Sequence, residues 1–435
     1  MKIIQGKDFD SYWKTETRKA DDLKTEKIVR KIIEDVRARG DAAVRKYASK
    51  WDKSSPVQFE VPLSEAKKAL EQLRSNDKAL AEALELAAQH IKIFCEKQRE
   101  QFSDFNFEMD KGLFTGQRII PVQKAAVYIP GGRFPLFSSV LMCMIPAFCA
   151  GVEEVMLSSP PAKDGLPDKK ILAASMIANS VCAADNKLRI FSIGGAQAVA
   201  AFALGTQTVP RVDVIAGPGS KFVAVAKRIL FGEVGIDFIA GPTDVLIIND
   251  GSVSNAAQLI AADMIGQAEH DADARSRALV PNTELANQIV SAIDSRLKEK
   301  PAAKASLDAG GLIIVYQNKE EAIRIANIIA PEHLELQTSD DDSLIPLLKN
   351  YGSLFIGSLS AEVLGDYSAG INHTLPTSAS ARFTGGLGVR HFLKTVTTLR
   401  CCQGEGYEKA LKAAEILARA EGLEGHAQSA AIRNS

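Results

Sequence analysis

The sequence predicts an α/β protein with two units, each built on a parallel sheet. From about residue 125 onward, short runs rich in Val and Ile alternate with helical stretches, which is the pattern of βαβ units. Several of these runs end in glycine or proline, the residues expected where a strand turns into a helix. The alternation begins again at residue 244, shortly after Gly241-Pro242, and this break divides the two units.

Each apolar run has the length of a strand and precedes a stretch with helical spacing. Strands that are joined through helices pair in parallel, so we expect one sheet in each unit. The expected strands of the first unit are 125–129, 155–157, 188–193 and 212–215, and those of the second are 244–248, 278–280, 311–315, 334–336 and 353–356.

Helical segments are expected at both ends of the chain. Residues 1 to about 110 are highly charged, and two amphipathic helices, over Asp22–Arg39 and Ala66–Phe94, are expected to cover a sheet. The tail Tyr407–Arg433 is rich in Ala, Glu and Lys and is expected to be helical, with a break at Gly422 and Gly425. The apolar positions of the two helices are Ile28, Ile32, Ile33 and Val36, and Leu70, Leu73, Leu80, Leu84 and Leu86.

Composition indicates an ordinary soluble protein. The 435 residues include 52 Lys and Arg against 53 Asp and Glu, and 46% are hydrophobic, so the chain has ample material for two or three cores. A net charge of -1 argues against a role in binding nucleic acid or an anionic membrane. The apolar stretch Leu136–Ala150 is too short to span a bilayer. Six cysteines without CxxC spacing indicate a reduced, cytoplasmic protein.

Three expected strand ends carry glycines that lead directly into a helix. They are Pro130-Gly131-Gly132, Gly194-Gly195-Ala196-Gln197 and Gly217-Pro218-Gly219-Ser220. Such turns expose backbone N–H groups at a helix N-terminus, where phosphate binds well, so together they suggest a dinucleotide cleft. The chain has no GxGxxG motif and no acid at the usual distance to hold a ribose. The alternative is that the glycines only make tight turns.

The histidines gather in the second unit, and five of the six follow residue 265. Gln267 and His270 are three residues apart in a helical run and therefore share a face. Asp366 lies in a segment that contains glycines, and His373 follows it. Imidazoles, a carboxylate and an amide oxygen suit zinc. The spacing matches no simple zinc motif, however, and each histidine could instead be a satisfied polar or core residue.

Glu332 and His333 follow Pro331 at a turn from a helix to a strand. An acid beside an imidazole can accept protons near neutral pH if one of the two is partly desolvated. The alternative is an exposed turn with two solvated polar groups.

Many segments, taken in order, resemble the histidinol dehydrogenase family over nearly the whole chain. The resemblance implies a homodimeric zinc- and NAD-dependent enzyme that oxidises L-histidinol to L-histidine through L-histidinaldehyde, the last step of histidine biosynthesis. The matching segments are Ala126–Gly132, Ile193–Ala198, Gly217–Gly219, Ala240–Leu246, Gln267–His270, Ala330–Leu336, Gly365–Gly370, Asn372–Thr377 and Glu421–His426.

The resemblance also implies roles for individual residues. Glu332 and His333 would be the catalytic bases, with Glu332 activating water. One zinc per subunit would be held by Gln267, His270, Asp366 and His426, the last supplied by the partner subunit. Tyr128, Gln197 and Ser220 would contact NAD. The substrate would contact Thr243, His333, His373, Glu421 and the four zinc ligands.

Two departures from the family pattern stand out. Ser220 replaces the usual Asn, which removes an amide from the expected NAD contact, whereas Thr243 replaces Ser and keeps the hydroxyl. Relatives of the family oxidise other small alcohols, such as sulfonated diols, and a dehydrogenase of such an alcohol is the nearest alternative. Glu421 suits a substrate with a cationic amine and therefore favours histidinol. A zinc hydrolase and a non-enzymatic binding protein are also consistent with parts of the pattern.

The resemblance implies two Rossmann-like domains with helical tails that pack across an intertwined dimer. We expect residues 1–22 to form an N-terminal tail, and 23–126 together with 243–387 to form the domain that carries the catalytic and metal residues. Residues 127–242 would be the NAD-binding domain, and 388–435 a helical tail that reaches the partner's site.

Overall fold

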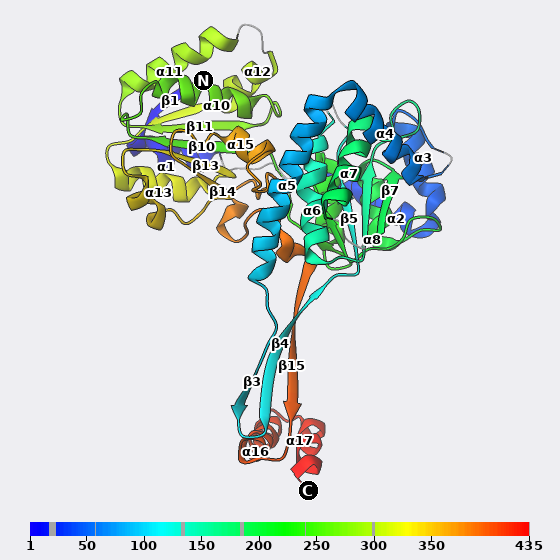
Figure 1. The fold of residues 1–435 in the computed structure, drawn as a ribbon. Helices are drawn as coiled ribbons and strands as arrows, with labels where there is room; N and C mark the ends of the chain where they lie inside the picture. The colour runs from blue at the N-terminus through cyan, green and yellow to red at the C-terminus, as the bar shows by residue number, and fades with distance from the viewer. Residues whose placement is uncertain are drawn as a thin grey trace.

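A computed structural model describes residues 1–435 except 17–22, 57, 132–134, 183–186, 240, 298–300 and 435. The chain forms two lobes and a long stalk that projects from them (Figure 1). Each lobe holds a six-stranded sheet, and a three-stranded sheet forms the stalk. The expected mixed α/β architecture with two mainly parallel sheets is therefore confirmed.

The sheet of the first lobe has the strand order β2-β7-β6-β5-β8-β9. All pairs are parallel except that of β2 with β7. Its four expected strands are present, and β2 and β9 extend it at the edges. The bounds are β2 Glu60–Val61, β5 Lys124–Tyr128, β6 Glu154–Ser159, β7 Lys187–Ser192, β8 Val214–Ala216 and β9 Gly235–Ile236.

The sheet of the second lobe has the order β1-β12-β11-β10-β13-β14, and every pair is parallel. Its five expected strands are present. The first residues of the chain add β1 as an edge strand, so they belong to this lobe and do not form a separate tail. The bounds are β1 Lys2–Gln5, β10 Asp244–Asn249, β11 Arg275–Val280, β12 Leu312–Val315, β13 His333–Gln337 and β14 Ser353–Ile356.

The early helices cover the first lobe, which corrects our assignment of residues 23–126 to the domain of 243–387. Helices α2 and α3 pack on α8, and α4 and α5 pack on α7. Their apolar faces share two hydrophobic cores with β5, β6 and β7. The contacts between helix faces are long-range, and amphipathic spacing does not specify which sheet a helix covers. The bounds are α2 Leu23–Arg39, α3 Asp41–Trp51, α4 Leu63–Asn76, α5 Lys78–Glu100, α6 Phe137–Ala150, α7 Lys169–Cys182, α8 Gly195–Leu204 and α9 Lys221–Leu230.

The segment expected as one helix over 66–94 is two helices, α4 and α5, which meet at Asp77. The Asp77 side chain accepts a hydrogen bond from the backbone N–H of Leu80 and caps the second helix.

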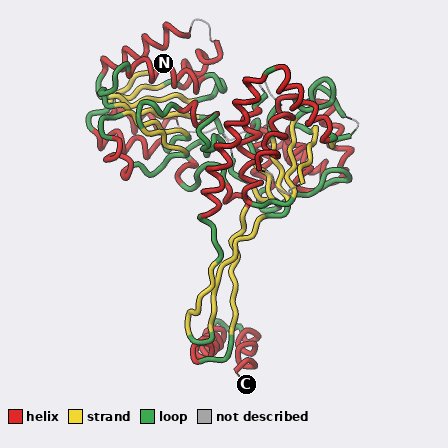
Figure 2. The backbone as a smooth tube through the Cα atoms, viewed as in Figure 1, coloured by secondary structure: helices red, strands yellow, loops and turns green. Residues whose placement is uncertain are grey.

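The second lobe is covered by helices packed on both sides of its sheet (Figure 2). These are α1 Phe9–Glu16, α10 Ala256–Ala268, α11 Thr283–Arg296, α12 Pro301–Gly310, α13 Lys319–Ile329, α14 Asp341–Leu344 and α15 Glu362–Tyr367.

The stalk was not expected from the sequence. It is an antiparallel sheet of β3 Phe105–Asp110, β4 Leu113–Pro121 and β15 Leu393–Cys401, in the order β15-β4-β3. The expected tail 388–435 is therefore helical only in its last part. Helices α16 Glu405–Ala420 and α17 Glu424–Ala431 lie at the far end of the stalk (Figure 1). The expected break at Gly422 falls between them, whereas Gly425 lies inside α17.

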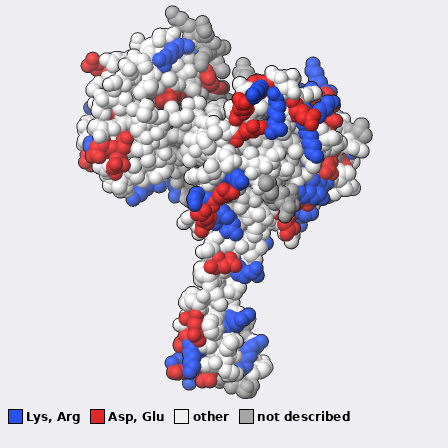
Figure 3. Space-filling view, in the orientation of Figure 1, with Lys and Arg blue, Asp and Glu red and all other residues white. Residues whose placement is uncertain are grey.

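The surface shows no concentration of one charge on the face drawn in Figure 3, where basic and acidic side chains are mixed over both lobes and the stalk. This agrees with the balanced composition. Among the helices of the described ranges, none combines the length and apolarity that crossing a membrane requires.

We predict that Ile91→Ala destabilises the first lobe, because Ile91 is 1% exposed on the face of α5 that contacts α6 and α7. The expected loss is about 2–5 kcal/mol of unfolding free energy, measured by urea denaturation. Ile93 lies on the same helix but is 48% exposed, so Ile93→Ala is the control and should cost well under about 1 kcal/mol. Equal losses would contradict the packing described here.

Candidate active site

A pocket of about 200 Å³ lies between the two lobes. It sits where the first sheet presents the ends of strands and the loops that follow them, and where the second sheet presents the starts of β10 and β13. The first lobe contributes the start of α6 and the Gly219 loop, and the second contributes the start of β10 and β13 and the helix α15. The side chains that line it include Ser139, Thr243, His270, Glu332, His333, Asp366, Tyr367 and His373.

Glu332 and His333 enter the pocket at the start of β13. Helix α13 ends at Ala330, whose φ of 51° turns the chain, and Pro331 prevents the helix from continuing. Parallel pairing of β13 with β10 then places His333 opposite Val245. Both site residues are buried, at 5% and 3% exposure, so the alternative of a solvated turn is wrong.

The Glu332 carboxylate is held by the neighbouring strand. Its Oε2 accepts hydrogen bonds from Thr243 Oγ1 at 2.5 Å and from the backbone N–H of Asp244 at 3.1 Å. In return, Asp244 Oδ1 accepts the backbone N–H of Glu332 at 3.0 Å. Burial, with the nearby charges of Asp244 and Asp366, raises the pKa of Glu332 well above its usual value despite these hydrogen bonds.

The His333 ring is oriented by a carbonyl. Its Nδ1 lies 3.3 Å from the backbone oxygen of Asp244, which can only accept, so Nδ1 carries the proton. Burial lowers the pKa of His333 and favours the neutral ring. Nε2 is then an unprotonated acceptor. It has no hydrogen-bond partner in the described part of the chain, and Asp366 Oδ1 lies 3.7 Å away.

A candidate cation site lies beside this ring. His270, Glu362 and Asp366 each place one donor atom within 4.8 Å of the others. The two acids are four residues apart on α15 and therefore share a face. Glu362 Oε2 is buried without a hydrogen-bond partner among the described residues. Buried carboxylates with a free oxygen beside an imidazole fit a divalent cation.

Interactions within this cluster shift the pKa values of its members in different directions. The hydrogen bond with Asp366, 3.5 Å between Nε2 and Oδ2, raises the pKa of His270. Burial alone would raise the pKa of Asp366, but His270 and the other imidazoles lower it. Burial and the charge of Asp366 raise the pKa of Glu362 well above its usual value.

Gln267 and His373 lie at the edges of the cluster. The Gln267 amide connects Thr243 and Glu362, since its oxygen lies 2.8 Å from Thr243 Oγ1 and its nitrogen donates to Glu362 Oε1 at 2.8 Å. His373 Nδ1 lies 2.7 Å from the Asp366 backbone oxygen, and its Nε2 lies 2.9 Å from Ser139 Oγ of the first lobe. His373 therefore links the two lobes at the pocket.

Two of the three glycine loops, 194–197 and 217–220, border a separate groove of about 480 Å³ in the first lobe. Gly132 of the remaining loop lies outside the described residues. Gln197 and Ser220, two expected NAD contacts, line it. Tyr128 lies behind it, and its hydroxyl accepts the N–H of Gly195 at 2.9 Å. Gly217 has a φ of 111°, and a side chain there would collide with the backbone oxygen of Tyr128, so this loop requires glycine.

The groove contains an acid that sequence reasoning did not find. Asp52 follows α3 and lines the groove, and its Oδ2 lies 3.5 Å from Gln197 Nε2. Burial raises its pKa to about 6, against hydrogen bonds from Gly194 and Gln197. It comes from outside the βαβ pattern, so the usual spacing from the glycines could not reveal it.

The structure does not bring every expected site residue together within one chain. Glu421 directly follows α16 and His426 lies on α17, and both are exposed at the far end of the stalk (Figure 1). Thr243, Gln267, His270, Glu332, His333, Asp366 and His373 do gather at the pocket or directly beside it. Their assigned roles stay predictions.

Sequence reasoning missed Glu362, Asp244 and Ser139. Glu362 had a detectable signal, because it precedes Asp366 by four residues in a short helical segment. Asp244 and Ser139 act through tertiary contacts with Glu332 and His373, and no local pattern marks them.

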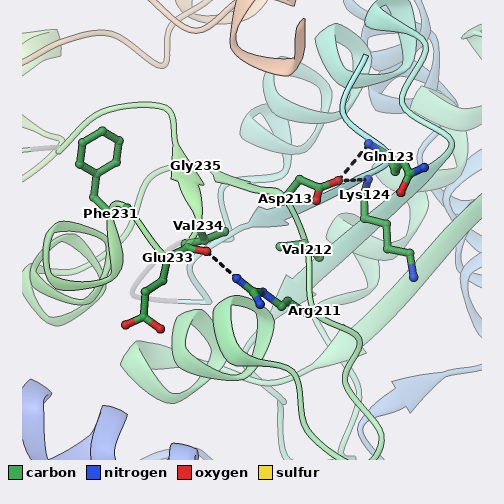
Figure 4. A pocket seen from close by; sticks show the side chains of 10 residues that line it. Gln123, Lys124, Arg211, Val212, Asp213, Phe231, Glu233, Val234 and Gly235 are labelled. Atoms are coloured by element: carbon green, nitrogen blue, oxygen red, sulfur yellow. Dashed lines mark hydrogen bonds between the residues drawn. The ribbon is translucent and has the colours of Figure 1, made fainter. Parts of the chain in front are cut away.

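Another hollow, of about 520 Å³, lies at the opposite edge of the first sheet, near the starts of β5 and β8 (Figure 4). Several of its polar groups already have partners within the protein. Asp213 accepts the backbone N–H groups of Gln123 and Lys124, and Arg211 donates to the backbone oxygen of Glu233 (Figure 4).

Comparison with known proteins identifies the family. The profile of the family described as histidinol dehydrogenase matches residues 15–434. The chain belongs to the histidinol dehydrogenase family. Histidinol dehydrogenase from Aquifex aeolicus is 42% identical over 415 residues, covering 94% of this chain and 92% of the relative. That from Thermus thermophilus is 42% identical over 95% of both chains.

A solved structure agrees with this assignment. The crystal structure of histidinol dehydrogenase from Elizabethkingia anophelis has a TM-score of 0.87 and 32% identity, covering 97% of this chain and 95% of that one. Matches of this length favour the histidinol dehydrogenase interpretation over a hydrolase, a binding protein or a dehydrogenase of sulfonated diols.

We predict that Arg277→Met destabilises the second lobe. Arg277 Nη1 lies 2.9 Å from Asp244 Oδ2, and the side chains are 7% and 10% exposed. Without Arg277 the Asp244 charge is buried alone, so the expected loss of unfolding free energy is about 3–5 kcal/mol. The double variant Asp244→Asn/Arg277→Met should lose less than the sum of the single variants. Additive losses in urea denaturation would show that the pair is not coupled.

Proposed function

We propose that this chain oxidises L-histidinol to L-histidine through L-histidinaldehyde with two molecules of NAD, as the last step of histidine biosynthesis. The observation that carries the proposal is the buried Glu332–His333 pair, with a free His333 Nε2 aimed at a cluster of cation ligands. Family membership over nearly the whole chain supports the same reaction.

His333 is the proton acceptor for both oxidation steps. Its Nε2 takes the proton of the substrate hydroxyl while hydride leaves the same carbon. In the second step it takes a proton from the aldehyde hydrate. The carbonyl of Asp244 holds the other ring nitrogen, so the ring keeps one tautomer and one orientation.

Glu332 is the base that activates water between the two oxidations. The carboxylate is fixed by Thr243 and Asp244, and burial raises its pKa, which makes it a stronger proton acceptor when ionised. The small pocket keeps the aldehyde away from bulk solvent between the two steps.

Zinc is the metal we propose, one per subunit, held by Gln267, His270, Asp366 and His426 of a second copy. Zinc there would supply a fixed charge that orients the imidazole and amine of the substrate. Glu362 lies within the same cluster, and burial raises its pKa, so a cation bound there would favour its ionised form. His373 and the second copy's Glu421 would contact the substrate, the latter through its amine.

NAD is proposed to bind in the groove of the first lobe, which we interpret as a Rossmann-like domain. The NAD phosphates would meet the N-termini of α8 and α9, beside Gln197 and Ser220. NAD bound there would accept the hydride. Asp52 supplies an acid for a ribose hydroxyl and would repel a 2′-phosphate.

The stalk supports the proposal of an intertwined homodimer. β3 is exposed along its whole length, and large apolar side chains also lie exposed on β15 and in the C-terminal segment 416–432. An apolar surface of this kind is costly in water and indicates a protein partner. The exposed residues are Phe105, Phe107, Met109, Leu399, Ile416, Leu417, Leu423 and Ile432. The six cysteines are all free, which fits the proposed cytoplasmic location.

The test of the reaction is the NADH formed per molecule of limiting L-histidinol by zinc-loaded protein. Two NADH and one L-histidine are expected. His333→Asn should lower kcat by about 10²–10⁴-fold because the base is lost. His90→Asn, on exposed α5 surface, should retain activity. Absence of NADH from folded, zinc-loaded protein would contradict the proposal, and sulfonated diols would then be the next substrates to assay.

The proposal that His426 completes the site of the partner subunit has its own test. His426→Ala and His333→Asn proteins should each be inactive. After unfolding and refolding together, mixed dimers would hold one intact site each, so about a quarter of wild-type activity should return. If His426 served its own chain, no activity would return. Refolding each variant alone is the control.

A further inference from the structure

Three cysteines lie together in the first lobe, away from the pocket. Cys95 is on α5, Cys149 is in the last turn of α6, and Cys182 is the last residue of α7. The three helices pack against one another, and all three cysteines belong to or contact the same hydrophobic core. Nothing in the proposed reaction uses them.

Cys149 is the centre of the cluster. Its thiol is hydrogen-bonded to those of both Cys95 and Cys182. The three sulfur atoms do not all approach one another, because the only group of three candidate metal ligands within 4.8 Å in the described chain is the one at the active site. Three thiolates on one zinc ion would need separations of about 4 Å. The arrangement therefore fits a reaction between pairs of sulfurs better than a trithiolate metal site.

The surroundings of Cys149 favour its thiolate. The hydrogen bonds from Cys182 and Cys95 lower the pKa of Cys149, and the positive charge of Lys92 acts in the same direction. Burial of Cys149 opposes this effect by raising its pKa, and two further features weaken it. Lys92 also pairs with Glu96 at 3.6 Å, and the carbonyl end of a helix disfavours negative charge.

Exposure distinguishes the two partners of Cys149. Cys149 and Cys182 are both partly exposed, whereas Cys95 is buried. Cys182 ends its helix, and Cys149 is one residue from the end of its own. A disulfide needs the sulfurs to approach to about 2 Å, and helix ends can shift more easily than the middle of α5.

We propose that Cys149 is a peroxide-sensitive thiol that forms a reversible disulfide with Cys182. The Cys149 thiolate attacks a peroxide oxygen, the O–O bond breaks, and a sulfenic acid forms as water leaves. The Cys182 thiol then attacks this sulfur, the S–S bond forms, and a second water leaves. Two thiols are oxidised and one hydrogen peroxide is reduced to two waters. A dithiol such as dithiothreitol reverses the bond.

The experiment uses full-length protein with Cys401→Ser and Cys402→Ser, because those two thiols are exposed at the end of β15. The protein is treated with equimolar hydrogen peroxide, and remaining thiols are alkylated. Tandem mass spectrometry of the non-reduced digest should find a Cys149–Cys182 cross-link, lighter by two hydrogen atoms and absent after dithiothreitol. Cys149→Ser should abolish the cross-link.

Cys143→Ala is the matched control. Cys143 is on the same helix but is buried and contacts Thr374, so this variant should form the cross-link at the wild-type rate. Circular dichroism verifies that each variant is folded. If Cys149 stays reduced in folded protein, or if it couples to Cys95 instead, the proposal is wrong.

Discussion

The reciprocal hydrogen bonds between Asp244 and Glu332 fix the geometry of the site. Asp244 begins β10 and Glu332 directly precedes β13, so the parallel pairing of two buried strands brings the two acids side by side. Each accepts a backbone N–H of the other. A buried carboxylate is costly unless hydrogen bonds and a counter-charge compensate it. Arg277 supplies that charge to Asp244, and the backbone carbonyl of Asp244 orients the His333 ring.

The pocket concentrates negative charge in a small volume. Glu332, Glu362 and Asp366 lie close enough to alter one another's pKa values. Mutual repulsion and burial favour protonation of the first two, while the neighbouring imidazoles keep Asp366 ionised. Such a site gains stability from a bound cation, and the same field attracts a substrate that carries an amine. The proposed preference for a cationic alcohol and the proposed binding of a metal ion would therefore share one electrostatic cause.

The two lobes and the stalk have different roles in the proposed reaction. The first lobe offers helix N-termini and a groove, the second offers the bases and ligands, and His373 bonded to Ser139 joins the two at the pocket. The stalk holds Glu421 and His426 away from their own pocket (Figure 1). This separation explains why one chain holds an incomplete set of the expected residues. The exposed apolar surface of the stalk fits the proposed dimer.

Nine strands of the two mainly parallel sheets, the glycine loops and the Glu332–His333 turn could be predicted from the sequence, because each depends on spacing within a few residues. Family resemblance added the expected ligands and substrate contacts. The packing of α2–α5 on the first lobe, the pairing of β1 with β12, and the stalk could not be predicted in this way, since each joins segments distant along the chain. Asp244, Ser139 and Asp52 also acquire their positions through such contacts. Local sequence thus determined the secondary-structure elements and the chemistry of the candidate residues. Tertiary structure decided which elements share a core and which side chains meet. The reason is that strand register and helix packing are set by burial between segments distant along the chain.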